Sequence, residues 1–576
     1  MSKRTYWGTT GGPYFFDERV FGFSAFFAAC TLSAGTSSSW SNRSAGTLPL
    51  RSPPCTERSG CYARGRAERL GVVGAPGDRR CAMRLRWGSW CGAAMASSAL
   101  LAGCGGTVTA GSDGGQGEPD ATTGTAGMPG SGSGLDSGPC PPGSPLDCYV
   151  DKDCGANPTT IVGTVFDPAG KTPLQNVVVF VPSDLASLPR ILPGASSCSA
   201  CDTSIGAFVT YAFTGTDGSF KLTGVPTGKN VPLVVQTGKW RRIITVPDVV
   251  DCATTQLPSS GTGQARLPRS HMEGDMPGMA LLTGGLDDLG CFLTRMGIAA
   301  SEYTAPHGGG RLDVYQGLGL VGNGPGLTNG TPGNCTDTSC PLWASKQSLE
   351  SYDMVLLACE GDTFDPDAQD AGVAKANVTK AGKQALHDWL NEGGKVFATH
   401  FHYTWFQYGP PDFQTVANWK GYSLGTGTCN DCAIDQSFWA GKNFYGWLKA
   451  VGALSGTGIN LTGVADSVSS VTPGAADRWI YDPGSMDPKY LSFDTPTGLD
   501  VPDGAIYGSD TLQRYCGRAV FTDLHAGGAP SGDVPGSCKA ADLSPQEKAL
   551  EYLFFDLSAC VRNESVQPSP PTQPPK

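Results

Sequence analysis

The sequence predicts a multidomain protein in which an antiparallel β-sandwich is followed by an α/β domain with a parallel sheet and a long insertion. Short β-type segments separated by turn residues fill residues 151–255, which is typical of a sandwich. From about residue 268, apolar strands alternate with helical segments, and this alternation predicts a parallel sheet covered on both faces. Glycine supplies 80 of the 576 residues and only 16% of residues are charged, so long loops and linkers are expected as well.

The net charge and the number of cysteines limit the kinds of partner and the cellular compartment that suit this protein. Residues 1–103 hold 13 Lys and Arg against 5 Asp and Glu, which leaves a net charge of −19 on the rest of the chain within a total of −11. This acidic body argues against a nucleic-acid partner, because neutralising phosphates requires a basic face. Of the 21 cysteines, 16 lie from Cys104 onward, and this density indicates an oxidising compartment with structural disulfides.

A secretory targeting segment is predicted at 83–103. The basic start Met83-Arg84-Leu85-Arg86 is followed by an apolar stretch that ends in Leu101-Ala102-Gly103-Cys104. This ending resembles the bacterial lipobox, which implies that Cys104 carries a lipid and that the protein is anchored to a membrane of the bacterial cell envelope. Gly105 after that cysteine favours the outer membrane, by resemblance to the sorting of known lipoproteins.

Segments without a folding pattern flank the signal and close the chain. Residues 1–82 are rich in Arg, Gly and Ser, and we expect a disordered upstream segment ahead of the true start at Met83. A second apolar stretch, at 20–30, follows acidic residues where a signal needs basic ones. Residues 104–150 are expected to form a Gly/Ser-rich tether, and residues 561–576 a disordered tail.

The sandwich is predicted over residues 151–255. Its expected strands are 161–165, 177–181, 211–214, 220–222 and 231–236. The motifs G-T-V-F-D, T-D-G-S-F and G-V-P-T-G resemble those of the carboxypeptidase regulatory-like fold. In that family the fold is a non-catalytic accessory module. The resemblance therefore implies a fold for this domain and no catalytic activity.

Most cysteines of the body are expected in disulfides. Cys198 and Cys201 match half of a zinc site or a redox motif, but a structural disulfide, with or without exchange to Cys252, suits a secreted β-domain better. A disulfide-pinned entry to the domain is expected from Cys140, Cys148 and Cys154. Local disulfides are expected for Cys335 with Cys340 and for Cys429 with Cys432, the second pair with zinc ligation as the alternative.

The α/β domain is predicted over residues 268–560. Its expected strands are 278–283, 352–358, 395–399 and 517–522. Its expected helices are 286–296, 379–391 and 545–557. An insertion at about 407–515 holds a helix-like segment at 444–451 and β-like segments near 479–481 and 490–493.

Polar side chains follow three of these strands. Cys359-Glu360 come after one strand, His400 and His402 after the next, and Asp523 with His525 after the last. Open α/β sheets bind their ligands at the carboxyl ends of parallel strands. The sequence therefore predicts that these side chains converge on one site.

Three motifs of this domain carry a second resemblance. A Tyr-Asp pair before an apolar strand, G-G-K-V-F-A-T-H at 393–400 and G-R-A-V-F-T-D-L-H at 517–525 are similar to motifs of the class I glutamine amidotransferase-like superfamily, closest to its trehalose-utilisation (ThuA-like) branch. The resemblance implies a flavodoxin-like sheet. Amidotransferases carry a nucleophilic cysteine in a G-x-C-x-G elbow after the strand that here ends near Thr399. This chain has His400 there, so the resemblance does not extend to glutaminase chemistry.

The histidines predict a metal site. His400, His402 and His525 match the ligands of a divalent metal ion, with Asp523 or Glu360 as neighbours. Alternate side chains of an extended H-x-H point to opposite faces, so both histidines bind one ion only if the chain bends there. The alternative is that the histidines are hydrogen-bonded linings of an inactive cleft. A divalent metal is the one cofactor to which the sequence points.

A cysteine mechanism is the second possibility at this site. Cys359 would be the nucleophile, His400 or His525 the base and Glu360 the group that orients it, with the amide of Gly361 as an oxyanion donor. The alternative is a buried or disulfide-bonded cysteine without reactivity.

Aromatic residues around the insertion suggest ligand binding. Tyr403 and Trp405, with His402 and Asp523 beside them, are candidates for contacts with a glycan or another small molecule. The alternative is that these aromatic side chains form core.

Two functions follow from the sequence. One is a lipid-anchored surface binding or scaffold module, whose cleft binds a small ligand or glycan without turnover. The other is a hydrolase of an amide, ester or glycan-related bond that uses His400, His402 and His525, with or without a divalent metal.

Overall fold

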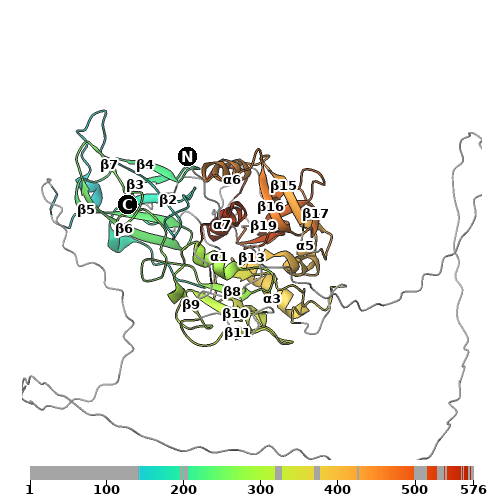
Figure 1. Ribbon diagram of the computed structural model, residues 1–576. Helices are drawn as coiled ribbons and strands as arrows, with labels where there is room; N and C mark the ends of the chain where they lie inside the picture. Colours follow the sequence, from blue (N-terminus) through green and yellow to red (C-terminus); the bar gives the residue numbers. More distant parts are fainter. Residues whose placement is uncertain are drawn as a thin grey trace, which may run out of the picture. The chain divides into compact units, whose positions relative to one another are not determined.

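The computed structural model describes residues 140–571, apart from 142, 195–197, 199–204, 318–326, 369–376, 424–426, 499–514, 528–537, 539–540, 560, 562 and 569–570 (Figure 1). The expected upstream segment, the signal at 83–103, Cys104 and the tether up to residue 139 lie outside this range. Within it, the protein is mixed α/β and rich in sheets. No described helix is long and apolar enough to cross a membrane.

Two small sheets form the first half of the described chain. The three-stranded sheet has the order β4-β1-β7, with β1 (Thr160–Thr164), β4 (Ser219–Thr223) and β7 (Thr254–Gln256). The four-stranded antiparallel sheet has the order β3-β2-β5-β6, with β2 (Val178–Pro182), β3 (Phe208–Phe213), β5 (Gly228–Thr237) and β6 (Trp240–Val249). Side chains of both sheets share one buried core, for example Leu222 of β4 and Leu233 of β5.

Strands β6 and β7 are not predicted from the sequence. The β6 strand follows β5 through a tight hairpin in which Thr237 pairs with Trp240. Its apolar alternation is interrupted by Arg241, Arg242 and Asp248, which hides the strand from pattern reading. The β7 strand has three residues and pairs in parallel with β1, so its burial depends on a partner distant in sequence.

One large sheet dominates the second half. Its main path runs β11-β10-β8-β12-β13-β20-β19-β18-β15-β16, and β9 pairs with β10. The strands from β11 to β20 are parallel: β8 (Met279–Thr283), β9 (Tyr303–Thr304), β10 (Leu312–Gln316), β11 (Gly333–Asn334), β12 (Met354–Leu357), β13 (Lys395–Thr399) and β20 (Gly517–Thr522). The β12 and β20 strands are buried along their whole length, as expected for parallel strands covered on both faces.

The insertion extends this sheet with antiparallel strands, which the sequence analysis does not foresee. Its strands are β14 (Ala417–Trp419), β15 (Gly427–Ile434), β16 (Ile459–Val464), β17 (Val468–Val471), β18 (Asp477–Tyr481) and β19 (Pro488–Thr495). The β19 strand pairs antiparallel with β20, and all but one of its eight side chains are buried. Strands β15, β16, β18 and β19 of the insertion are therefore part of the large sheet, whereas β14 and β17 pair with each other in a separate two-stranded sheet.

The helices agree in position with most sequence expectations. They are α1 (Leu289–Arg295), α2 (Lys346–Leu349), α3 (Lys380–Asn391), α4 (Thr404–Gln407), α5 (Pro411–Gln414), α6 (Trp439–Ala450) and α7 (Pro545–Ser558). Thr379 caps α3 by accepting a hydrogen bond from the backbone N–H of Gly382. After α3, Gly393 adopts φ of +115°, and a side chain at Gly394 would collide with the ring of Trp389, so both positions require glycine.

The disulfides correct one expected pairing. Cys198 pairs with Cys516 across 318 residues, and Cys252 pairs with Cys154, so Cys198 is not bonded to Cys201. Spacing alone cannot reveal such a pairing, because the fold brings the partners together. The remaining disulfides of the described residues are Cys140–Cys148, Cys291–Cys538, Cys335–Cys340 and Cys429–Cys432. The two local disulfides expected from the sequence are confirmed.

Two segment boundaries also differ from expectation. Residues 146–149, assigned to the tether, form a short 3-10 helix in which Leu146 is buried. Glu564, assigned to a disordered tail, is 3% exposed and pairs with the buried guanidinium of Arg518. Both segments pack on the folded body through contacts that low-complexity composition does not reveal.

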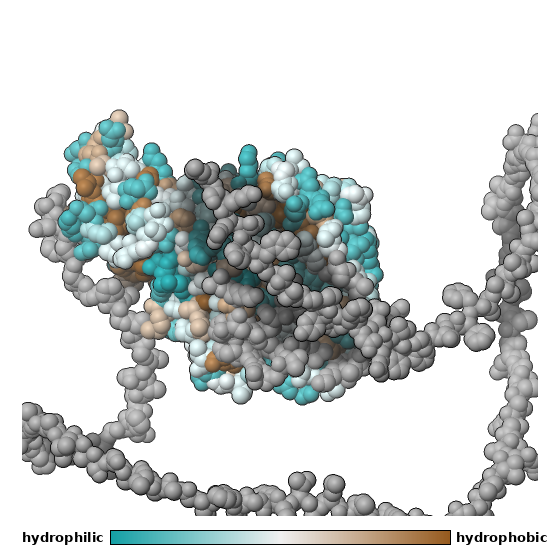
Figure 2. Space-filling view, in the orientation of Figure 1, coloured by the Kyte–Doolittle hydropathy of each residue, from teal (hydrophilic) through white to brown (hydrophobic). Residues whose placement is uncertain are grey.

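The surface visible in Figure 2 shows apolar residues scattered among polar ones. The most exposed large apolar side chains of the described residues belong to separate segments: Leu192, Val250, Met272 and Met486. Isolated apolar residues of this kind are normal on a soluble surface and need no partner.

The two halves of the described chain share a contact around α7. The ring of Trp240 in β6 packs edge-on against Phe554 and Phe555 of α7. Asp167 of the first half is 1% exposed and faces Glu551 of α7, which is fully buried. Burial and this neighbour raise the pKa of Glu551, and burial raises the pKa of Asp167 to about 6. The contact therefore combines aromatic packing with a pair of buried carboxyl groups.

We expect Glu551→Gln to raise the melting temperature at pH 8 by roughly 3 °C and to change it little at pH 5. Raised carboxyl pKa values mean that the folded protein holds protons which the unfolded chain releases, so their stabilisation is present at acid pH and lost as the pH rises through about 6. A neutral amide at residue 551 removes this loss. Melting curves against pH check it, with Glu350→Gln as the control, since the side chain of Glu350 is 41% exposed and lies outside this contact. An equal change at both pH values would contradict the expectation.

Candidate functional site

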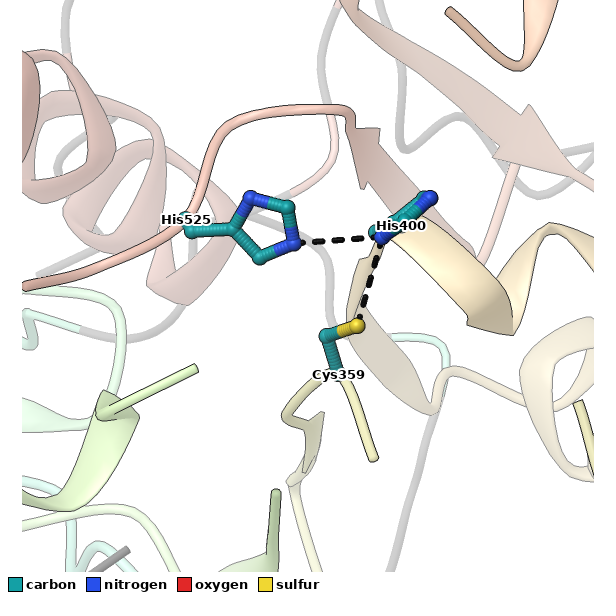
Figure 3. A group of neighbouring side chains, drawn as sticks. All are labelled: Cys359, His400 and His525. Carbon is teal, nitrogen blue, oxygen red and sulfur yellow. Dashed lines mark hydrogen bonds between the residues drawn. The ribbon is translucent and has the colours of Figure 1, made fainter. Parts of the chain in front are cut away.

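The carboxyl ends of four adjacent parallel strands define the site. In the order β8-β12-β13-β20, these strands are followed by Asp287, Cys359, His400 and His525. The register pairs Leu357 of β12 with Ala398 of β13, so Cys359 and His400 stand two residues beyond a matched pair. The structure thus brings Cys359, His400 and His525 together, as Figure 3 shows.

Cys359 is the first member of this group. Its side chain is fully buried, and its Sγ atom lies 3.3 Å from Nδ1 of His400. Burial raises the pKa of the thiol, while the backbone N–H groups of Phe401 and Gly361 act in the opposite direction. Among the described cysteines, it is the one without a disulfide partner. Of the alternative stated above, a buried or disulfide-bonded cysteine, the structure shows a buried cysteine and no disulfide.

His400 begins the 3-10 turn η6 (His400–Tyr403) directly after β13. Its φ of +40° lies in the left-handed region, which is unfavourable for a residue with a side chain and is found at tightly constrained sites. Its Nε2 lies 2.8 Å from the carbonyl oxygen of Ser423 and therefore donates its N–H there. Burial, with a smaller contribution from His525, lowers the pKa of His400 to about 3, so the ring is neutral at physiological pH.

His525 completes the group from the loop after β20. Its Nδ1 donates an N–H to the carbonyl oxygen of Gly463, at 2.6 Å. Its Nε2 lies 3.2 Å from Nδ1 of His400, and the two rings are perpendicular (Figure 3). Both carbonyl partners, Ser423 and Gly463, come from the insertion.

Asp287 is a neighbour that the sequence analysis assigned only to a helix start. Its Oδ1 accepts the backbone N–H of Ala526 at 2.6 Å, directly beside His525. The adjacent residue, Leu286, donates its backbone N–H to the carbonyl oxygen of Cys359. Burial raises the pKa of Asp287, and His525 partly offsets this. The signal available in the sequence was its position after the first apolar strand, at the same edge of the sheet as the other site residues.

His402 does not join the other histidines, which corrects the expected metal and ligand set. Its Nε2 donates to the carbonyl oxygen of Ala358 at 2.9 Å, and its Nδ1 accepts the indole N–H of Trp405 at 3.1 Å. The η6 turn directs this side chain into the core, so both ring nitrogens are satisfied by protein groups. Burial lowers the pKa of His402 to about 4.

The other predicted site residues also lie apart from the group of three. Tyr403 and Trp405 are core residues, with 0% and 1% exposure, and Trp405 packs edge-on against Trp343. Asp523 accepts the backbone N–H of Ser467 at 2.8 Å and so holds the insertion against β20; burial raises its pKa to about 6. Glu360 is buried with its carboxylate against Gly317. These positions support the expectation of core for the aromatics.

A second cluster of candidate ligands has a different explanation. Asp151, Cys154, Asp251 and Cys252 gather near the start of the described chain, but both cysteines are joined in a disulfide. Their sulfur atoms are therefore not thiolate ligands.

Comparison with known proteins adds no relative to this description. No protein-family model and no curated protein matches the chain.

We expect Cys359 to resist iodoacetamide in the folded protein and to react after unfolding, because its side chain has no exposed surface. Peptide mapping without a reductant checks this, with disulfide-bonded Cys291 as the internal control that stays unlabelled. Rapid labelling of Cys359 in the native protein would contradict the described burial.

Proposed function

We propose that the protein is a lipid-anchored hydrolase of the bacterial cell envelope, acting on an amide, ester or glycan-related bond at Cys359, His400 and His525. One observation carries the proposal: a thiol and two imidazoles from three strand ends lie in mutual contact. Hydrolysis requires an activated nucleophile, and thiol and imidazole groups supply one either directly, as nucleophile and base, or as ligands of a metal ion that activates a water molecule.

The same contacts favour a hydrolase over a binding module without turnover. The residues expected to bind a glycan, Tyr403 and Trp405, are enclosed in the core. By contrast, Cys359 remains a thiol in a chain whose other described cysteines are all in disulfides. A reduced thiol beside two histidines favours a catalytic role for Cys359 over a structural one.

We further propose that the first half is a β-sandwich of the carboxypeptidase regulatory-like kind and the second an amidotransferase-like domain with a flavodoxin-like sheet. Two facing sheets with one core support the first assignment. The second is supported by the parallel strand order β10-β8-β12-β13-β20 and by the left-handed residue directly after β13, where that family has its elbow.

We expect His525→Ala and Cys359→Ala each to lower turnover by at least ~100-fold on any substrate that the purified protein cleaves, because each removes a group in contact with His400. A panel of chromogenic esters, amides and glycosides supplies the assay. His307→Asn is the matched control, since this exposed histidine has φ of +62°, which asparagine tolerates. Turnover that survives both substitutions would exclude this centre as the catalytic one.

We expect the protein expressed from Met83 to fractionate with membranes and its Cys104→Ser variant to be released as a soluble protein, because a single lipid-bearing cysteine is the proposed anchor. Fractionation with detection of both forms in the same cells is the measurement. Equal distribution of the two forms would refute the anchor.

A further inference from the structure

The two histidines of the site meet through nitrogens that carry no proton. A carbonyl oxygen can only accept a hydrogen bond, so Nε2 of His400 holds its proton toward Ser423 and Nδ1 of His525 holds its proton toward Gly463. In neutral rings the lone pairs are then on Nδ1 of His400 and Nε2 of His525. These are the atoms that face each other at 3.2 Å.

Two lone pairs at this distance repel each other, and a cation between them turns this repulsion into attraction to a shared charge. The sulfur of Cys359 is directed at the same point, 3.3 Å from Nδ1 of His400, and all three donor atoms lie within 4.8 Å of one another. A tetrahedral zinc ion with ordinary bond lengths sets two nitrogen ligands about 3.3 Å apart and a nitrogen and a sulfur about 3.6 Å apart. The two separations measured from Nδ1 of His400 therefore need only a small outward movement to match a bound ion.

We infer that Cys359, His400 and His525 bind one zinc ion or a similar first-row divalent metal, and that this ion is the centre of the proposed hydrolase. Thiolate and imidazole ligands select zinc, cobalt or copper over magnesium and calcium, which prefer oxygen. Three protein ligands leave one position for water, as in catalytic zinc sites. The catalytic role of the ion rests on the proposed function. The binding of the ion is inferred from the donor atoms alone.

The surroundings of the three donors match those of known metal centres. Histidine ligands commonly donate their second N–H to a backbone carbonyl, which orients the ring, and Ser423 and Gly463 accept these bonds here. The backbone N–H groups of Phe401 and Gly361 interact with the Cys359 sulfur, as suits a thiolate. Asp287 stands beside His525 and, together with the thiolate, balances the charge of a divalent ion.

Binding is balanced by the release of one proton. The divalent ion replaces the proton of the Cys359 thiol, which passes to solvent, and forms bonds to sulfur and to the two bare nitrogens. No oxidant or reductant takes part. The water in the fourth position would supply the nucleophile for hydrolysis, so Cys359 acts as a ligand and forms no covalent intermediate.

The test is metal analysis of the purified full chain after removal of metal by a chelator and reloading with Zn²⁺ alone. We expect one zinc per chain, release of about one proton on binding, and at least ~10-fold weaker binding in His525→Ala. His387→Ala on α3 is the control and should bind as the wild type does, because the ring of His387 bonds to Asp388 and Asp412 and to none of the three donors. Absence of stoichiometric zinc, or binding that is equal in wild type and His525→Ala, would overturn the inference.

Cobalt substitution keeps the test independent of folding defects in the histidine variants. Wild-type protein loaded with Co²⁺ should show a sulfur-to-cobalt charge-transfer band, and the near-isosteric Cys359→Ser should lose this band while it keeps its fold by circular dichroism. A cobalt complex whose spectrum is the same in both proteins would exclude Cys359 as a ligand. Turnover without metal would leave the hydrolase and remove the metal centre, whereas bound metal without turnover would leave the centre and remove the hydrolase.

Discussion

The hydrogen bonds from two histidines to carbonyl groups of the insertion decide what the site can do. Once Ser423 and Gly463 hold the protons of His400 and His525, the remaining nitrogens are bare and face each other. The same two bonds join the insertion to the ends of β13 and β20. Chemistry at the sheet edge therefore depends on a segment that, in sequence, resembles only an interruption of the α/β pattern.

The sheet supplies the second constraint through its register. Leu357 pairs with Ala398, so Cys359 and His400 occupy equivalent positions beyond adjacent strands. On the next strand, Arg518 at the opposite end of β20 is held by Asp494 of β19 and Asp556 of α7. A buried ion network of this kind contributes little to the free energy of unfolding, but it favours one relative position of the strands over others. It fixes β20, and through it the loop with His525, against the neighbouring strands.

Particular residues show which features of the fold and of the site could be predicted from the sequence. The strand at 395–399 and the convergence of Cys359, His400 and His525 were predictable, because apolar runs ending in polar residues mark the carboxyl edge of a parallel sheet. The direction of the His402 side chain was not predictable, because the 3-10 turn that directs it toward Ala358 and Trp405 depends on local backbone geometry. Asp287 was missed because its bond to Ala526 joins residues 239 positions apart. The antiparallel half of the sheet was hidden for the same reason: the order of its strands follows from pairing between residues that are distant in sequence.

The position directly after β13, which His400 occupies, determines how the site can work. In the amidotransferase-like fold proposed above, a constrained turn at this place presents the reactive side chain, and here His400 adopts a left-handed backbone. The thiol stands at the equivalent position of the neighbouring strand instead. An imidazole held at the elbow by Ser423 cannot move toward a substrate as a nucleophile does, and a sulfur enclosed behind it has no exposed surface. Groups arranged in this way are suited to hold an ion in place, and the mobile reactant is then the water that the ion binds.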